Sequence, residues 1–159
     1  MTNTALQPLP TGTSDFEALR DAGQIYVDKT AQIYQLASLR QKFFLTRPRR
    51  FGKSLLVSTF ASLFKNGLKY FSGLAIEKLW KDSTYNVVEI DFSEIKNIEG
   101  IRDFRKQLDD TLVDAFEPAG FRCDEKKSQS VIKQLSRWMK KLPTNSLVLL
   151  IDEYDSPLT

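Results

Sequence analysis

The sequence contains no histidine and a single cysteine, Cys123. Without histidine, the chain cannot build a Ser-His-Asp triad, a Cys-His pair, an HExxH zinc site or a histidine general base. One cysteine excludes an intrachain disulfide and a cysteine-rich metal site. We interpret Cys123 as a spectator thiol, in keeping with a reducing cytosol.

Long hydrophobic runs are also missing. The longest strongly apolar run is 147–151, whereas a membrane-spanning helix needs about 20 residues. The first 13 residues are polar, contain two prolines and have no apolar stretch, which argues against a signal peptide. We therefore expect a cytoplasmic protein that has no membrane partner.

What remains is an ordinary globular composition. Of the 159 residues, 42% are apolar and 27% are charged, and 23 basic against 20 acidic side chains give a net charge of +3. These values favour a packed core over disorder. We predict a flexible lead over 1–13 and one domain over 14–159.

Hydrophobic periodicity and turn residues predict helices that alternate with short apolar strands. This order predicts an α/β fold, a three-layer sandwich with a mainly parallel sheet. We expect Ser14 to cap the first helix, and the apolar strands at 43–45 and 147–151 to lie centrally, covered on both faces. The expected helices span 15–21, 28–39, 53–65, 101–116 and 124–141, with a short one near 74–80, and the expected strands span 24–27, 42–46, 86–92 and 146–151.

The segment 47–54 reads Arg-Pro-Arg-Arg-Phe-Gly-Lys-Ser and lies between an expected strand and an expected helix. Its second half fits the phosphate-binding loop G-x-x-x-x-G-K-[ST]. Gly52 would let the backbone approach phosphate, Lys53 would reach the β- and γ-phosphates, and the Ser54 hydroxyl would ligate Mg²⁺. Arg47 stands where that pattern has its first glycine, and an ordinary helix start is the alternative interpretation.

A second motif, at 147–155, is an apolar strand that ends in Asp-Glu and reads as a Walker B element. Asp152 would hold Mg²⁺, directly or through water, and Glu153 would orient or deprotonate the attacking water. The alternative is a buried strand that ends in ordinary turn carboxylates. The two motifs occur in the right order, so together they favour a P-loop NTPase fold.

The string L-T-R-P-R-R-F-G-K-S-L at 45–55 resembles the AAA-ATPase-like domain often found ahead of a PD-(D/E)XK nuclease-like domain. Further stretches similar to that family lie at 26–30, 73–76, 91–93 and 151–158. The family's loop carries R-P-R-R-F, so Arg47 is a family feature. The resemblance implies ATP or another NTP, Mg²⁺ and an association with mobile elements and genome conflict. The implied nucleotide-binding residues are Arg47, Arg49, Arg50, Phe51, Gly52, Lys53, Ser54 and Leu55.

Basic residues cluster twice, around the loop and at helical spacing on the last expected helix. One interpretation is a patch for nucleic-acid phosphates. The other, which we prefer, is a solvated helix face plus compensation of nucleotide charge. The second cluster comprises Lys133, Arg137, Lys140 and Lys141.

Members of the family continue beyond Walker B with a sensor strand, an arginine-finger region and a lid. This chain ends soon after Walker B, so we expect ATP turnover to be weak or absent. We interpret it as an interaction or inhibitor protein of NTPase fold in phage–host or mobile-element conflict, with a protein or nucleoprotein target. The alternative is an active Mg-dependent ATPase module, or an N-terminal fragment, of a larger ATPase–nuclease protein.

If the sensor strand is missing, the strand at 42–46 has to pair directly with the strand at 146–151 or leave open apolar edges. We favour direct pairing. A truncated apolar side of this kind would serve self-association into a homo-oligomer or binding of the target.

Overall fold

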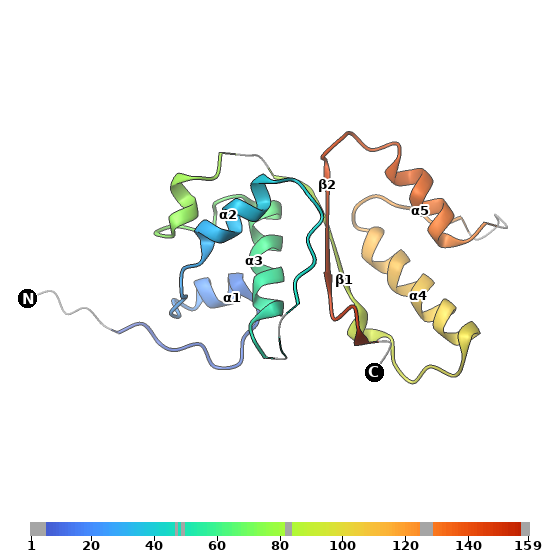
Figure 1. Ribbon diagram of the computed structural model, residues 1–159, viewed down its shortest axis with the longest axis horizontal. Coiled ribbons are helices and arrows are strands. Elements are labelled where there is room, and N and C mark those ends of the chain that lie inside the picture. Colours follow the sequence, from blue (N-terminus) through green and yellow to red (C-terminus); the bar gives the residue numbers. More distant parts are fainter. Residues whose placement is uncertain (1–5, 47, 49, 82–83, 125–128, 157–159) are drawn as a thin grey trace, which may run out of the picture. The chain divides into compact units, whose positions relative to one another are not determined.

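The computed structural model describes residues 6–46, 48, 50–81, 84–124 and 129–156 (Figure 1). The chain divides into two units, Met1–Thr84 and Tyr85–Thr159. Each unit has its own buried side chains. The prediction of one domain over 14–159 stays a prediction.

The first unit is helical in its described part. Its elements are α1 (Phe16–Asp21), α2 (Thr30–Ser38), α3 (Lys53–Asn66) and the 3-10 helix η1 (Ala75–Lys78). The predicted helix at 53–65 is confirmed, and Gly67 ends it at a positive φ of 61°. The predicted cap of the first helix is wrong: the carboxylate of Asp15, rather than Ser14, accepts a hydrogen bond of 3.0 Å from the Ala18 N–H.

The core of this unit forms where α1 packs on α3. Phe16 and Phe71 are fully buried, with ring centroids 4.7 Å apart. The Phe16 N–H donates to the hydroxyl of Ser58 on α3 over 2.8 Å. Burying an aromatic side chain contributes about 1.5–3 kcal/mol, so this contact holds the short α1 helix in place.

Two predicted strands of the first unit, at 24–27 and 42–46, do not form. In the second segment Phe43, Phe44 and Leu45 are 50%, 70% and 40% exposed, so the expectation of a covered central strand at 43–45 is wrong. A strand needs a neighbour that pairs its backbone N–H and C=O groups. The apolar run predicted burial, but it carries no information about which segment would be its partner.

The second unit carries the sheet. Strands β1 (Asn86–Asp91) and β2 (Leu147–Asp152) pair in parallel, from Asn86 opposite Leu147 to Asp91 opposite Asp152. Between them come η2 (Phe92–Glu94), α4 (Ile101–Phe116) and α5 (Val131–Met139). The parallel pairing and the bounds of α4 are as predicted. The last helix is shorter than the predicted 124–141, and residues 125–128 of that prediction lie outside the described residues.

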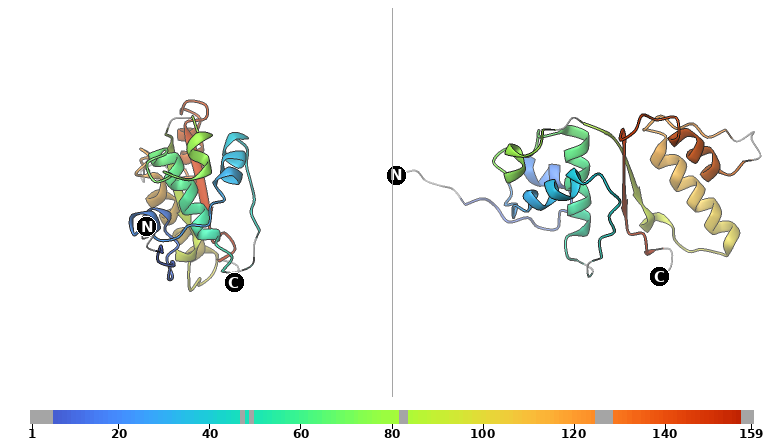
Figure 2. Two further views of the ribbon diagram at one scale, coloured as in Figure 1. Left: turned by 90° about the vertical axis from the view of Figure 1, so that its left-hand side faces the viewer. Right: turned by 45° about the horizontal axis from the view of Figure 1, so that its top comes forward.

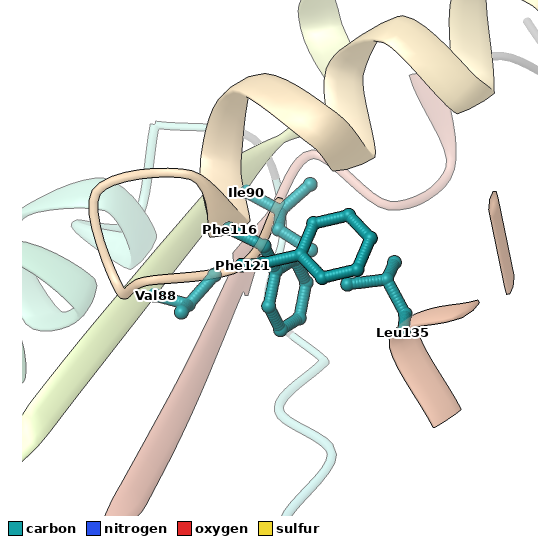
Figure 3. Close-up of a cluster of buried hydrophobic side chains, with 5 residues drawn as sticks. All are labelled: Val88, Ile90, Phe116, Phe121 and Leu135. Carbon is teal, nitrogen blue, oxygen red and sulfur yellow. The ribbon is translucent and has the colours of Figure 1, made fainter. Parts of the chain in front are cut away.

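Helices α4 and α5 lie on the same side of the two strands (Figures 1 and 2). Side chains of β1 and of both helices meet there in one buried cluster (Figure 3), and the partly buried Leu147 of β2 packs against it. Its central members are Val88, Ile90, Phe116, Phe121 and Leu135. The Trp138 ring meets both Phe116 and Phe121 edge-on, with centroids 6.0 and 5.9 Å away.

Strand β2 is less covered than the sequence suggests. In the parallel register, Leu149 and Ile151 lie opposite the buried Val88 and Ile90, yet they are 44% and 42% exposed. The predicted burial of 147–151 on both faces is therefore wrong. Among the described residues the strand partner of β2 is β1, and the predicted pairing of β2 with a strand at 42–46 is not formed.

The fold is thus a mixed α/β arrangement with a small parallel sheet, as the class prediction required. The finer expectation of a three-layer sandwich stays a prediction. In the part of the chain that the structure describes, no helix combines the length and the apolar character needed to cross a bilayer.

Candidate nucleotide-binding loop and acidic strand ends

The predicted phosphate-binding loop runs directly into α3. Gly52 precedes the helix in the left-handed conformation, with φ 71° and ψ 29°. The first helical hydrogen bond of this end joins the Leu56 N–H to the Gly52 carbonyl over 3.1 Å. A Cβ built on Gly52 would meet no atom within 4 Å. Glycine is therefore favoured here by its backbone conformation and not by crowding.

A second left-handed residue lies two positions earlier. Arg50 has φ 64°, unusual for a residue with a side chain. Successive turns of this kind aim backbone N–H groups into a shared concavity, which binds anions. Arg47 and Arg49, predicted to contribute to the same loop, lie outside the described residues. Phe51, between the two left-handed positions, is 65% exposed.

The first turn of α3 offers donors for such an anion. The N–H groups of Lys53, Ser54 and Leu55 precede the first intrahelical bond, so they have no acceptor within the helix. The positive end of the helix dipole lies at the same place. Lys53 and Ser54 are partly exposed. The donor set, a cation, a hydroxyl and backbone N–H groups, fits the phosphates of a nucleotide.

The second predicted motif lies in the other unit, at the carboxyl ends of the strands. Asp152 ends β2, and the parallel register places Asp91, the last residue of β1, directly opposite. Paired strands lie about 4.8 Å apart, and paired residues point to the same face. Our sequence reasoning gave Asp91 no role. The signal was present, because both strands are apolar runs that end in aspartate.

Glu153 follows β2 in a strained conformation, with φ 48°. Its N–H donates to Oδ1 of Asp152 over 2.9 Å, and its carbonyl accepts from the Ser156 N–H over 2.9 Å. A non-glycine residue with positive φ stores strain, and such residues gather at functional sites. The turn fixes the backbone of both predicted carboxylates.

The described residues contain no group of three or more His, Cys, Asp or Glu side chains placed to hold a metal ion. A Mg²⁺ ion rarely needs a group of three protein ligands, because it is commonly held by one or two carboxylates, substrate phosphates and water. The Asp91–Asp152 pair therefore has the right chemistry for Mg²⁺. The loop and the strand ends belong to different units, and the structure brings together the residues of each group within its own unit.

Asp28, at the start of α2, is a structural anchor. Its Oδ1 accepts from the N–H and the hydroxyl of Thr30, over 2.8 and 2.6 Å, and its Oδ2 accepts from the Ala75 N–H over 2.7 Å. The buried Thr30 hydroxyl in turn accepts from the Ile76 N–H over 3.0 Å. Two of the stretches that suggested the family, 26–30 and 73–76, are thus joined to each other.

These bonds also set the charge of Asp28. Desolvation by itself would raise the pKa of this carboxyl. The hydrogen bonds from Thr30 and Ala75 and the positive charge of Arg20 outweigh it, so the pKa is lowered.

The predicted basic cluster on the last helix lies on exposed positions. Lys133, Arg137, Lys140 and Lys141 are all exposed, whereas Leu135 of the same helix is buried in the core. The Arg137 guanidinium donates to the side-chain oxygen of Gln129 over 2.5 Å. A solvated helix face and a patch for nucleic acid both require exposed side chains, so both interpretations stay predictions.

The comparisons with known proteins identify the family of the chain. A family described as "Predicted AAA-ATPase" matches residues 10–159. The chain therefore belongs to the AAA-ATPase-like family. It is also 32% identical over 152 residues to an "Uncharacterized protein in vnfD 5'region" of Azotobacter chroococcum mcd 1, a match that covers 94% of this chain and 29% of that protein. No solved structure matches.

Proposed function

We propose that the chain is a nucleotide-binding module that holds the phosphates of ATP, or another NTP, at 50–55. The observation that carries the proposal is Gly52, whose left-handed backbone opens α3 with Lys53 and Ser54 at its first two positions. Family membership supports the same assignment. In this proposal Lys53 neutralises phosphate charge, and Ser54 is a ligand of the accompanying Mg²⁺.

Calorimetric titration of Mg·ATP into the wild type and Lys53→Ala tests the loop. The substitution removes the cation aimed at the phosphates, so the dissociation constant should rise roughly tenfold or more, about 1.4 kcal/mol. Lys65→Ala, in the last turn of the same helix, is the matched control and should leave the affinity unchanged. Equal affinities of the wild type and Lys53→Ala would overturn the loop assignment.

We propose that the carboxylates at the strand ends bind the metal ion and activate the attacking water. Asp152 is the candidate Mg²⁺ ligand, and Asp91 opposite it is a second. Glu153 is the candidate base for the attacking water. When bound, Mg²⁺ would neutralise charge on the phosphates.

Weak or absent ATP turnover stays a prediction, and phosphate release measures it. Release near background in both the wild type and Glu153→Gln would agree with it. Fast release that Glu153→Gln abolishes would instead support the active ATPase module. The chain spans less than a third of the relative it matches, so the activity of any longer protein is itself a proposal.

A second candidate function is an interaction role. Phe43, Phe44 and Leu45 are consecutive apolar residues and each is at least 40% exposed, a pattern that marks interaction sites. This role would be supported if Phe43→Ser lost the self-association that the wild type shows in light scattering. It would also be supported if Phe43→Ser lost the capture of a purified protein target. The inhibitor role in phage–host or mobile-element conflict stays a prediction.

A further inference from the structure

The first unit contains an open hollow of about 540 Å³ that is separate from the loop. Two short segments line it. One is the C-terminal half of α2 with the residue beyond Leu39, and the other begins at the end of η1. α2 and η1 contact each other. The lining residues are Tyr34, Ser38, Arg40, Lys78, Leu79, Trp80 and Lys81.

The described residues that line this hollow carry charge of one sign. They include Arg40, Lys78 and Lys81, and none of these described residues is acidic. The neighbouring Glu77 directs its carboxylate elsewhere, to the Gly73 N–H at 2.9 Å. Three cations gathered in a concave surface attract and hold an anion, because the concavity focuses their field.

The remaining lining residues provide a firm and partly apolar wall. Trp80 is only 6% exposed, and its ring packs edge-on against Phe64 of α3, with centroids 5.8 Å apart. Leu79 is 38% exposed, and Ser38 adds a hydroxyl. The volume falls within the range of small-molecule sites, which combine apolar walls with a few polar groups.

The contact between Trp80 and Phe64 also locates the hollow relative to the loop. Phe64 lies near the C-terminal end of α3, and Lys53 is its first residue. At about 1.5 Å per residue, these two positions are about 16 Å apart along the helix. A triphosphate seated at the loop therefore does not account for the cations of the hollow.

We propose that this hollow binds a phosphorylated small molecule of nucleotide size. Arg40, Lys78 and Lys81 take its phosphate, and Tyr34 and Leu79 contact its apolar or planar part. Arginine pairs well with phosphate oxygens, and lysine adds a mobile positive charge. A nucleic-acid strand would be expected to follow a long basic stripe, whereas these cations surround one compact hollow.

AMP is a suitable probe, titrated into the full chain that carries Lys53→Ala so that the loop does not contribute. AMP should bind at one site, and adding Lys78→Gln with Lys81→Gln should raise its dissociation constant at least tenfold. Lys96→Gln with Lys106→Gln removes the same charge from exposed positions in the second unit and should change nothing. Circular dichroism of each variant checks that it is folded.

Three further ligands, titrated in the same way, show which part of AMP the hollow recognises. Inorganic phosphate should bind more weakly than AMP, and adenosine should not bind. Failure of AMP to bind, or equal affinity in the Lys78/Lys81 and control variants, would overturn the proposal. An oligonucleotide that binds more tightly than AMP in a Lys78- and Lys81-dependent manner would also overturn it, in favour of a nucleic-acid site. None of these outcomes depends on nucleotide binding at Lys53.

Discussion

Two serines of α3, one turn apart, have opposite roles. The Ser58 hydroxyl accepts from the Phe16 N–H over 2.8 Å. The Ser62 hydroxyl is buried and has no hydrogen-bond partner among the described residues. A buried polar group without a partner costs free energy, while a satisfied one stabilises.

We therefore expect the alanine variants of these serines to differ in sign. Ser58→Ala leaves the Phe16 N–H without its acceptor and should lower the free energy of unfolding by about 1–2 kcal/mol. Ser62→Ala removes an unsatisfied hydroxyl and introduces the best helix former, so it should be neutral or stabilising by about 0.5 kcal/mol. Urea unfolding of both variants measures this. Equal destabilisation by the two would contradict the assignment of Ser62 as unpartnered.

At Gly52 the effect of backbone conformation can be tested separately from the effect of side-chain contacts. An added Cβ would meet nothing within 4 Å, so Gly52→Ala should cost only the left-handed backbone, about 1–2 kcal/mol. Asparagine tolerates this conformation better than alanine, and Gly52→Asn should regain part of the loss. Thermal unfolding of the two variants measures the difference in their stability. An alanine variant as stable as the asparagine variant would show that the positive φ is unimportant.

At the scale of elements, Asp28 links α2 to η1, and this link should depend on pH. Because the pKa of Asp28 is lowered in the folded chain, the carboxylate keeps its charge to a lower pH than in the unfolded chain. Its stabilisation is therefore fully present above the unfolded value, near 3.8, and is lost as pH falls through the folded pKa.

Asp28→Asn keeps the size of the side chain but removes the charge. At pH 7 it should lower the free energy of unfolding by about 1 kcal/mol, at the low end for bonds to a charged group because the carboxylate is exposed. The difference from the wild type should shrink as pH falls below about 4. Unfolding curves at several pH values measure it. A difference that is constant from pH 7 down to acid would mean that the bonds act without the charge.

The elements most predictable from sequence are those whose signals are local. The bounds of α4 were predicted because an apolar stripe, Gly100 before it and Pro118 after it all lie in one segment. The loop at Gly52 was predicted for the same reason. The predicted strand at 42–46 was wrong because strand formation depends on pairing with residues elsewhere in the chain, which a local pattern does not show.

The candidate site shows the same division. Asp152 ends a recognisable apolar strand and Glu153 follows it, so both could be proposed as site residues from the sequence alone. The place of Asp91 opposite Asp152 was not, because it depends on the register of two strands that are far apart in sequence. The hollow at Arg40 was missed as well, since its two lining segments meet only in the folded unit.

At the scale of the whole molecule, the two units differ in what holds them together. The first relies on helix packing around Phe16 and Phe71, and the second on aromatic side chains packed against β1. All members of the buried cluster against β1 come from residues after Thr84. We therefore expect each unit to respond mainly to substitutions in its own core.

Phe121→Ala and Phe16→Ala in the full chain form a matched pair for this expectation. Both remove a ring that is at most 2% exposed, at a cost of about 3–5 kcal/mol. Hydrogen exchange followed by mass spectrometry should show faster exchange of β1 and α4 in the first variant and of α3 in the second. The other unit should keep most of its protection, because units with separate cores open separately. Equal loss of protection across both units in either variant would mean that the chain unfolds as one cooperative body, and the prediction of a single domain over 14–159 would then be the better description.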